Sequence, residues 1–108
     1  MSLPSLGEFE ELILLIVAVL HDEAYGVTIF DEIEARRGRS ASISAIHMSL
    51  KRLEEKGFLE SRFGGITQDR GGRRKKFYTI TALGKKVLDE QYKLRTNLYR
   101  DIPKISFE

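Results

Sequence analysis

The sequence predicts a mainly α-helical fold that contains one small β-hairpin, an α+β arrangement. Apolar residues recur at helical spacing in three segments before residue 57 and in one segment after residue 81. Between them, residues 58–63 and 73–80 alternate in polarity or are rich in aromatic and β-branched side chains, as strands are. The chain has 108 residues, of which 42% are hydrophobic, so we expect a single compact domain.

The first helix is expected over residues 7–21, with Ser5 as its N-cap and three glutamates in its first turn, near the positive end of the helix dipole. From Leu12 to Leu20 this helix is apolar on every side, and such a helix has to be covered all round. We interpret this pattern as a sign of dimerisation. The alternative is a long helix that is wrapped by the core of its own chain.

A second helix is expected from Tyr25 or Gly26 to Arg37, where Gly38 ends it. Its apolar residues at helical spacing are Val27, Phe30 and Ile33.

A third helix is expected over residues 43–56, with Ser42 as its N-cap and Gly57 as the glycine that ends it. One narrow apolar stripe runs along it, formed by Ile43, Ile46, Leu50 and Leu53. The opposite side carries Ser44, Met48 and Lys51, and it is flanked by Ala45, His47 and Arg52.

Residues 58–63 and 73–80 predict two strands, with Leu59 and Phe63 on the apolar face of the first. The nine residues between them, 64–72, include four glycines, so we expect a hairpin with a long, mobile and basic loop.

Thr81 is the expected N-cap of a fourth helix that runs from residue 82 to 97 or 99. One apolar stripe contains Leu83, Val87, Gln91, Leu94 and Leu98, and a second stripe about 100° away contains Leu88, Tyr92 and Tyr99. Two apolar faces on a terminal helix again indicate a partner. Residues 100–108, which include Pro103, are expected to form a loose tail.

Composition excludes several classes of function. The chain has no cysteine, which excludes disulfide frameworks, cysteine-rich zinc sites and thiol nucleophiles and fits a reducing compartment. No nucleophile stands beside a histidine, no glycine-rich phosphate loop precedes a helix, and the adjacent His21, Asp22 and Glu23 cannot converge on one ion. We therefore expect neither an enzyme nor a bound metal or cofactor. The longest apolar run has nine residues, so we expect a soluble, cytoplasmic protein without a membrane span.

Charge is distributed unevenly along the chain. Residues 1–34 hold eight acidic residues and no lysine or arginine, whereas residues 36–86 hold 14 basic and four acidic residues, a net charge of +10. A basic middle region can attract a polyanion while the acidic segment faces elsewhere.

Three helices followed by a hairpin is the order of a winged helix-turn-helix, in which the third helix enters the major groove of DNA and the hairpin is the wing. We therefore predict binding to double-stranded DNA. The candidate contact residues lie before the second helix, on the outer side of the third helix and in the wing: Tyr25, Ser42, Ser44, Ala45, His47, Met48, Lys51, Arg52, Arg70, Arg73, Arg74, Lys75 and Lys76. For His47 the alternatives are a plain surface histidine and a pH-sensitive switch. Met48 either contacts a thymine methyl group or is ordinary surface.

Three stretches carry a resemblance to the PadR-like family of transcriptional regulators: Tyr25-Gly26, the string LKRLEEKGFL at residues 50–59, and the string GRRKKFYTITALG at residues 72–84. The resemblance covers residue 6 to about residue 94. It implies a homodimeric repressor that binds palindromic operators, of the short branch that lacks a larger C-terminal dimerisation domain. His47 stands where the family usually has tyrosine, and Ser44 where it often has glycine, so the operator sequence cannot be carried over.

The resemblance also implies that the first and last helices build the dimer. The candidate interface residues are Leu12, Leu15, Ile16, Val19, Val87, Leu88, Gln91, Tyr92, Leu94, Leu98 and Tyr99. We divide the chain into a DNA-binding domain (1–81), a dimerisation helix (82–99) and a tail (100–108). Two alternatives stay open: a sensor that binds a hydrophobic small-molecule effector between the dimer helices, near Leu88, Tyr92 and Tyr99, and a winged helix that binds a protein.

Overall fold

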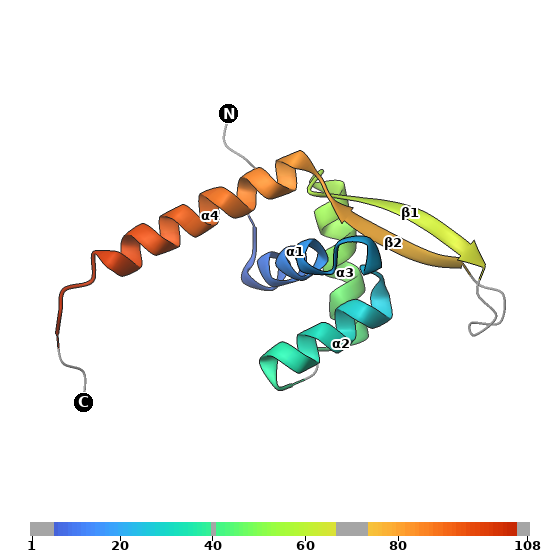
Figure 1. Cartoon of the computed structure of the whole chain (residues 1–108), viewed down its shortest axis with the longest axis horizontal. Helices are drawn as coiled ribbons and strands as arrows, with labels where there is room; N and C mark the ends of the chain where they lie inside the picture. The colour runs from blue at the N-terminus through green and yellow to red at the C-terminus, as the bar shows by residue number, and fades with distance from the viewer. Residues whose placement is uncertain (1–5, 40, 67–73, 106–108) are drawn as a thin grey trace.

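The structure is a computed structural model and describes residues 6–39, 41–66 and 74–105. Its elements in chain order are α1 (Glu8–Leu20), the 3₁₀ turn η1 (His21–Glu23), α2 (Gly26–Arg37), α3 (Ile43–Glu55), β1 (Leu59–Ile66), β2 (Arg74–Ile80) and α4 (Ala82–Arg100). The two strands form an antiparallel hairpin. The predicted α+β class and the predicted order of elements are confirmed (Figure 1).

Helix α1 lies at the centre of the fold and contacts α2, α3, β2 and α4 (Figure 1). Each of these elements contributes apolar side chains to a single core. The core residues are Ile13, Leu14, Ile16, Val17, Ala24, Ile29, Ile33, Ile46, Leu50, Leu53, Phe58, Leu59, Tyr78, Val87 and Leu88. The apolar run of α1 is thus used largely within its own chain.

The start of α1 differs from the sequence prediction. Gly7, not Ser5, is the N-cap, and its backbone N–H donates a hydrogen bond of 2.9 Å to Oε1 of Glu10. The predicted Ser5 cap was wrong, because the cap position is Gly7, whose backbone N–H is hydrogen-bonded by the Glu10 carboxylate. Ser5 itself lies outside the described residues.

Two predicted core positions are instead exposed. Val27 lies two residues before the buried Ile29, which is about 200° of helix rotation, so it faces away from the core. Phe63 shares the alternation of the buried Leu59 but is 61% exposed, and the outer part of the hairpin projects beyond the helices (Figure 1). Periodicity predicted which residues share a face, but not how far the core extends along that face.

Hydrogen bonds attach the inner end of the hairpin to neighbouring parts of the chain at two points. The N–H of Tyr78 in β2 donates to the carbonyl of Ala24, just before α2, at 2.8 Å. At the base of the hairpin, the Thr81 hydroxyl donates to the carbonyl of Gly57 at 2.7 Å and accepts from the N–H of Gly84 at 3.0 Å. Gly57 has a positive φ of 82°, which turns the chain from α3 into β1 as predicted.

One ion pair links the first and third helices. Nζ of Lys56, at the end of α3, donates to Oε1 of Glu10 in α1 at 2.8 Å, and the side chain of Glu10 is nearly buried. Burial alone raises the pKa of Glu10, but the hydrogen bonds from Lys56 and from the Gly7 backbone, with the nearby positive charges of Lys56 and Arg52, outweigh it. The pKa of Glu10 is therefore below its ordinary value.

A bilayer span is not found among the helices of the described ranges, since none has both the length and the apolar character that it needs.

Gly84→Ala is expected to destabilise the fold, because a Cβ at this position would lie 2.4 Å from the carbonyl oxygen of Phe58 and 2.8 Å from Cγ1 of Ile80. Overpacking against backbone costs on the order of 1–3 kcal/mol of unfolding free energy, measurable by urea denaturation. Gly26→Ala is the matched control, since it also lies in the first turn of a helix and its Cβ would make only an ordinary contact of 3.7 Å with His47. Equal stabilities of the two variants would contradict this packing argument.

Glu10→Gln is expected to lower the unfolding free energy at pH 7 by about 1–3 kcal/mol, because it removes the negative charge that pairs with the Lys56 ammonium and leaves only a neutral acceptor at this partly buried site. Since the folded-state pKa of Glu10 is depressed, its contribution is present above its ordinary value of 4.5 and is lost as the pH falls through the folded-state pKa. The difference between the natural chain and the variant should therefore shrink as the pH falls below 4.5 and on through the folded-state pKa of Glu10. Glu8→Gln, an exposed first-turn carboxylate, serves as the control for loss of charge at this helix end.

Candidate nucleic-acid interface

The outer side of α3 is free of contacts with the core. The Ser42 side chain accepts a hydrogen bond of 3.0 Å from the Ala45 N–H, which confirms the predicted cap and fixes where the helix starts. Ile46, Leu50 and Leu53 are buried, as predicted, and Ser49 is buried with them. Ala45 on the outer side of this helix is half-buried. The other candidate contact residues of the helix are exposed: Ser44, His47, Met48, Lys51 and Arg52.

Strand β2 places three cationic side chains beside α2 and α3. Nζ of Lys75 lies 4.4 Å from the ring centroid of Tyr25 and donates to the Tyr25 hydroxyl at 3.3 Å. Nζ of Lys76 lies 3.9 Å from the Glu54 carboxylate, in a pair that is well exposed and correspondingly weak. Arg74 is exposed at the outer end of the strand.

The ring of Phe77 holds the hairpin against the start of α2. It meets the ring of Tyr25 edge-on at 5.3 Å, and the Arg62 guanidinium of β1 lies 4.9 Å from its centroid. A Cβ on Gly64 would lie 2.4 Å from a ring carbon of Phe77, so only a glycine at this position leaves room for the ring. The Tyr25 side chain at the start of α2 is therefore packed against residues of the hairpin.

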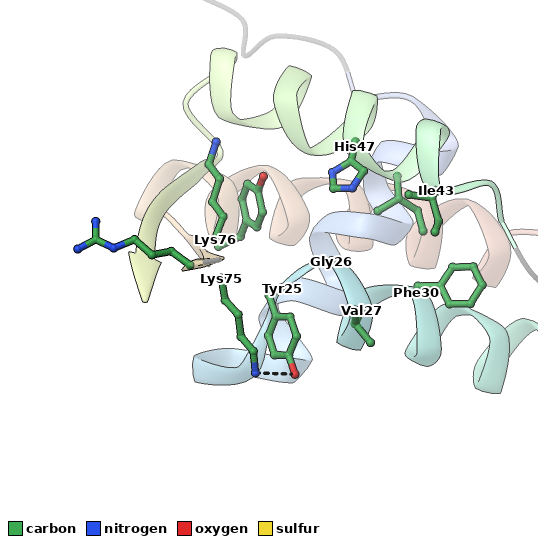
Figure 2. A pocket seen from close by; sticks show the side chains of 11 residues that line it. Tyr25, Gly26, Val27, Phe30, Ile43, His47, Lys75 and Lys76 are labelled. Atoms are coloured by element: carbon green, nitrogen blue, oxygen red, sulfur yellow. Dashed lines mark hydrogen bonds between the residues drawn. The ribbon is translucent and has the colours of Figure 1, made fainter. Parts of the chain in front are cut away.

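A cleft of about 530 Å³ lies between the starts of α2 and α3 and strand β2. Figure 2 shows Lys75 and Tyr25 joined by their hydrogen bond on one side of it, and Val27 and Phe30 from α2 on the other. The residues that line the cleft include no aspartate or glutamate: Tyr25, Gly26, Val27, Phe30, Ile43, Ile46, His47, Arg74, Lys75, Lys76 and Tyr78. The cleft thus combines a cationic side with an apolar one.

The electrostatics of this surface favour an anion. Arg74, Lys75, Lys76, Lys51 and Arg52 come from two adjacent elements and are at least partly open to solvent. Burial, and to a smaller extent the negative charge of Glu54, raises the pKa of the Tyr78 hydroxyl above its ordinary value of 10.0. A row of phosphates is the polyanion that such spaced cations fit.

Sequence reasoning missed the apolar side of the cleft. Ile43 was predicted to lie in the core stripe of its helix, but it is exposed, because α3 begins beyond the residues that cover Ile46. Val27 and Phe30 also line the cleft without having been predicted there. Of the predicted DNA contacts, Arg70 and Arg73 lie outside the described residues.

The candidate dimer residues fall into three sets by exposure. Ile16, Val87 and Leu88 are buried in the core of the chain itself, so little of these side chains is left for contact with a partner. Leu12 and Gln91 are half-buried. The exposed set comprises Leu15, Val19, Tyr92, Leu94, Leu98 and Tyr99.

The second half of α4 extends beyond the rest of the molecule (Figure 1). Its tyrosines are among the most exposed large side chains of the described chain, with 72% of Tyr92 and 78% of Tyr99 accessible. An ion pair of 3.2 Å between Arg95 of this half and Glu11 of α1 links it to the body. An apolar stripe of this length along a projecting helix is typical of a surface that binds another protein chain.

Within the described residues, no group of three or more histidine, cysteine, aspartate or glutamate side chains is arranged to hold a metal ion.

Comparisons with known proteins agree on one family. Residues 14–90 match the model of the transcriptional regulator PadR-like family. An uncharacterised protein of Lysinibacillus sphaericus is 35% identical over 89 residues, which cover 81% of this chain and 77% of that protein.

Solved structures show the same fold. A PadR family transcription regulator of Clostridium difficile R20291 is 28% identical, with a TM-score of 0.71 over 87% of this chain and 93% of that one. A protein of Streptococcus mutans UA159 is 32% identical, with a TM-score of 0.68 over 92% and 91%. Bacillus subtilis PadR, solved in complex with operator DNA, is 27% identical with a TM-score of 0.64; the match covers 93% of this chain but only 54% of that protein.

Proposed function

The chain belongs to the PadR-like family of transcriptional regulators, and on this basis we propose that it is a homodimeric repressor that binds a palindromic DNA operator. The observation that carries the proposal is the exposed outer side of α3 next to the cations of β2. Family members are transcriptional regulators, in agreement with the prediction that the chain is not an enzyme.

In this proposal the residues have two kinds of role. Lys51, Arg52, Arg74, Lys75 and Lys76 contact phosphates and fix the register of the protein on the duplex. The outer side of α3 contacts base edges in the major groove. Ser42, Ser44, Ala45, His47 and Met48 form this reading surface, and Tyr25 supports it through Lys75.

A second copy of the chain is the proposed partner of α4. The exposed Tyr92, Leu94, Leu98 and Tyr99 support an interface along this helix, and Leu15 and Val19 of α1 extend it. We propose that residues 1–81 bind DNA, 82–99 form the dimer and 100–108 are a tail. Bacillus subtilis PadR, a similar protein, has been solved with operator DNA, which supports the same partner for this chain.

Selection of bound duplexes from a random pool is expected to yield an inverted repeat. Two α3 helices related by a twofold axis should lie about 34 Å apart, so that the half-site centres are one helical turn apart. A motif consisting of one isolated half-site would contradict the dimer.

The oligomeric state is a separate check. The chain should sediment as a dimer at micromolar concentration, and the double variant Leu94→Ser, Leu98→Ser should shift it toward monomer. A natural chain that is stably monomeric would overturn this part of the proposal.

Arg74→Ala is expected to weaken binding to all duplexes about equally, whereas Ser44→Ala should change which duplex is preferred. If each protomer neutralises about four phosphates, the dimer should show a log–log salt slope near −7, and Arg74→Ala should reduce its magnitude by about 2. Fluorescence anisotropy titrations at several salt concentrations measure both effects. Lys93→Ala, which removes an exposed cation from α4, is the control and should leave the slope unchanged; a flat salt dependence of the natural chain would exclude phosphate binding.

A further inference from the structure

Three exposed apolar side chains lie on the helix-turn-helix and not on the surface proposed for the dimer. They are Val27 at the start of α2, Ile43 at the start of α3 and Met48 on the outer side of α3. Ile43 is 59% exposed and Val27 48%, and both line the cleft, to which α4 contributes no residue. Dimerisation through α4 would therefore not explain why Val27 and Ile43 are exposed.

Ile43 is also held in one place. It is the first residue of α3, directly after the Ser42 cap, whose hydrogen bond to Ala45 sets the helix start. A β-branched side chain has one strongly preferred χ1 rotamer in a helix, so its two arms present a rigid apolar surface. His47 lies four residues later, on the same side of the helix, and lines the same cleft (Figure 2).

Only one group on the major-groove edges of the bases matches such a surface. Adenine, guanine and cytosine present hydrogen-bond donors and acceptors there, whereas thymine adds an apolar C5-methyl group. A phosphate gains nothing from an isoleucine. We infer that Ile43 is a specificity-determining residue that contacts a thymine methyl group in each half-site, with Val27 adding apolar surface from α2; this inference rests on the proposed DNA-binding function.

The test deletes the methyl group from the DNA and the side chain from the protein. In the duplex selected by the natural chain, each thymine in turn is replaced by deoxyuridine, which pairs in the same way but lacks the methyl group. At one thymine of each half-site, the replacement should weaken binding by the natural chain about fourfold, the loss that follows from exposing one buried methyl group. The same replacement should change binding by Ile43→Ser less than about twofold, roughly the error of an additive cycle.

Two further variants make the result specific. Ile43→Val removes a single methyl group, keeps the fold, and should show an intermediate sensitivity. Ile105→Ser is the matched control, since Ile105 is 58% exposed in the C-terminal tail and should keep the full sensitivity of the natural chain. Circular dichroism and thermal unfolding check that the variants are folded.

The outcomes separate this inference from the proposed function. If no duplex is bound by the natural chain, the proposed function fails and the inference fails with it. If DNA is bound but no thymine replacement matters, or if Ile43→Ser remains as sensitive as the natural chain, the inference alone is overturned. If Met48→Ser abolishes the sensitivity to thymine replacement while Ile43→Ser retains it, the methyl contact belongs to Met48. That result would also overturn the inference.

Discussion

The geometry of the reading surface depends on one backbone hydrogen bond, from the Tyr78 N–H of β2 to the Ala24 carbonyl before α2. This bond fixes the inner end of the hairpin to the turn from which α2 starts. Lys75 and Phe77 therefore lie against Tyr25, and the cationic strand lies next to the first turns of α2 and α3. A two-stranded ribbon alone is only marginally stable in water, so this bond acts together with the contacts at the base of the hairpin to hold the strands against the helices.

The sequence was sufficient for the elements but not for the extent of the core. The caps Ser42 and Thr81 and the terminating glycines Gly38 and Gly57 act through local hydrogen bonds and backbone angles, so neighbouring residues reveal them. Val27, Ile43 and Phe63 were predicted to face the core because their spacing is right. Whether such a residue is covered depends on where another element ends, which is tertiary information that periodicity does not contain.

The same limit explains the mixed outcome for the candidate dimer residues. An apolar stripe on α1 or α4 shows that a face must be covered, but not by which chain. Val87 and Leu88, near the start of α4, are covered by other parts of the same chain. Leu94 and Leu98 lie on the second half of α4, which projects from the body. The transition between the two sets falls near Gln91, which is half-buried.

The position of Lys75 in the free protein has an entropic consequence. A lysine in solution samples many rotamers, and restricting one on association costs about 0.5–1.5 kcal/mol. Contact with the Tyr25 ring and hydroxyl already restricts this side chain when the protein folds. The ammonium group is thus preorganised before any polyanion arrives, and part of the ordering cost of association is already met in the unbound state.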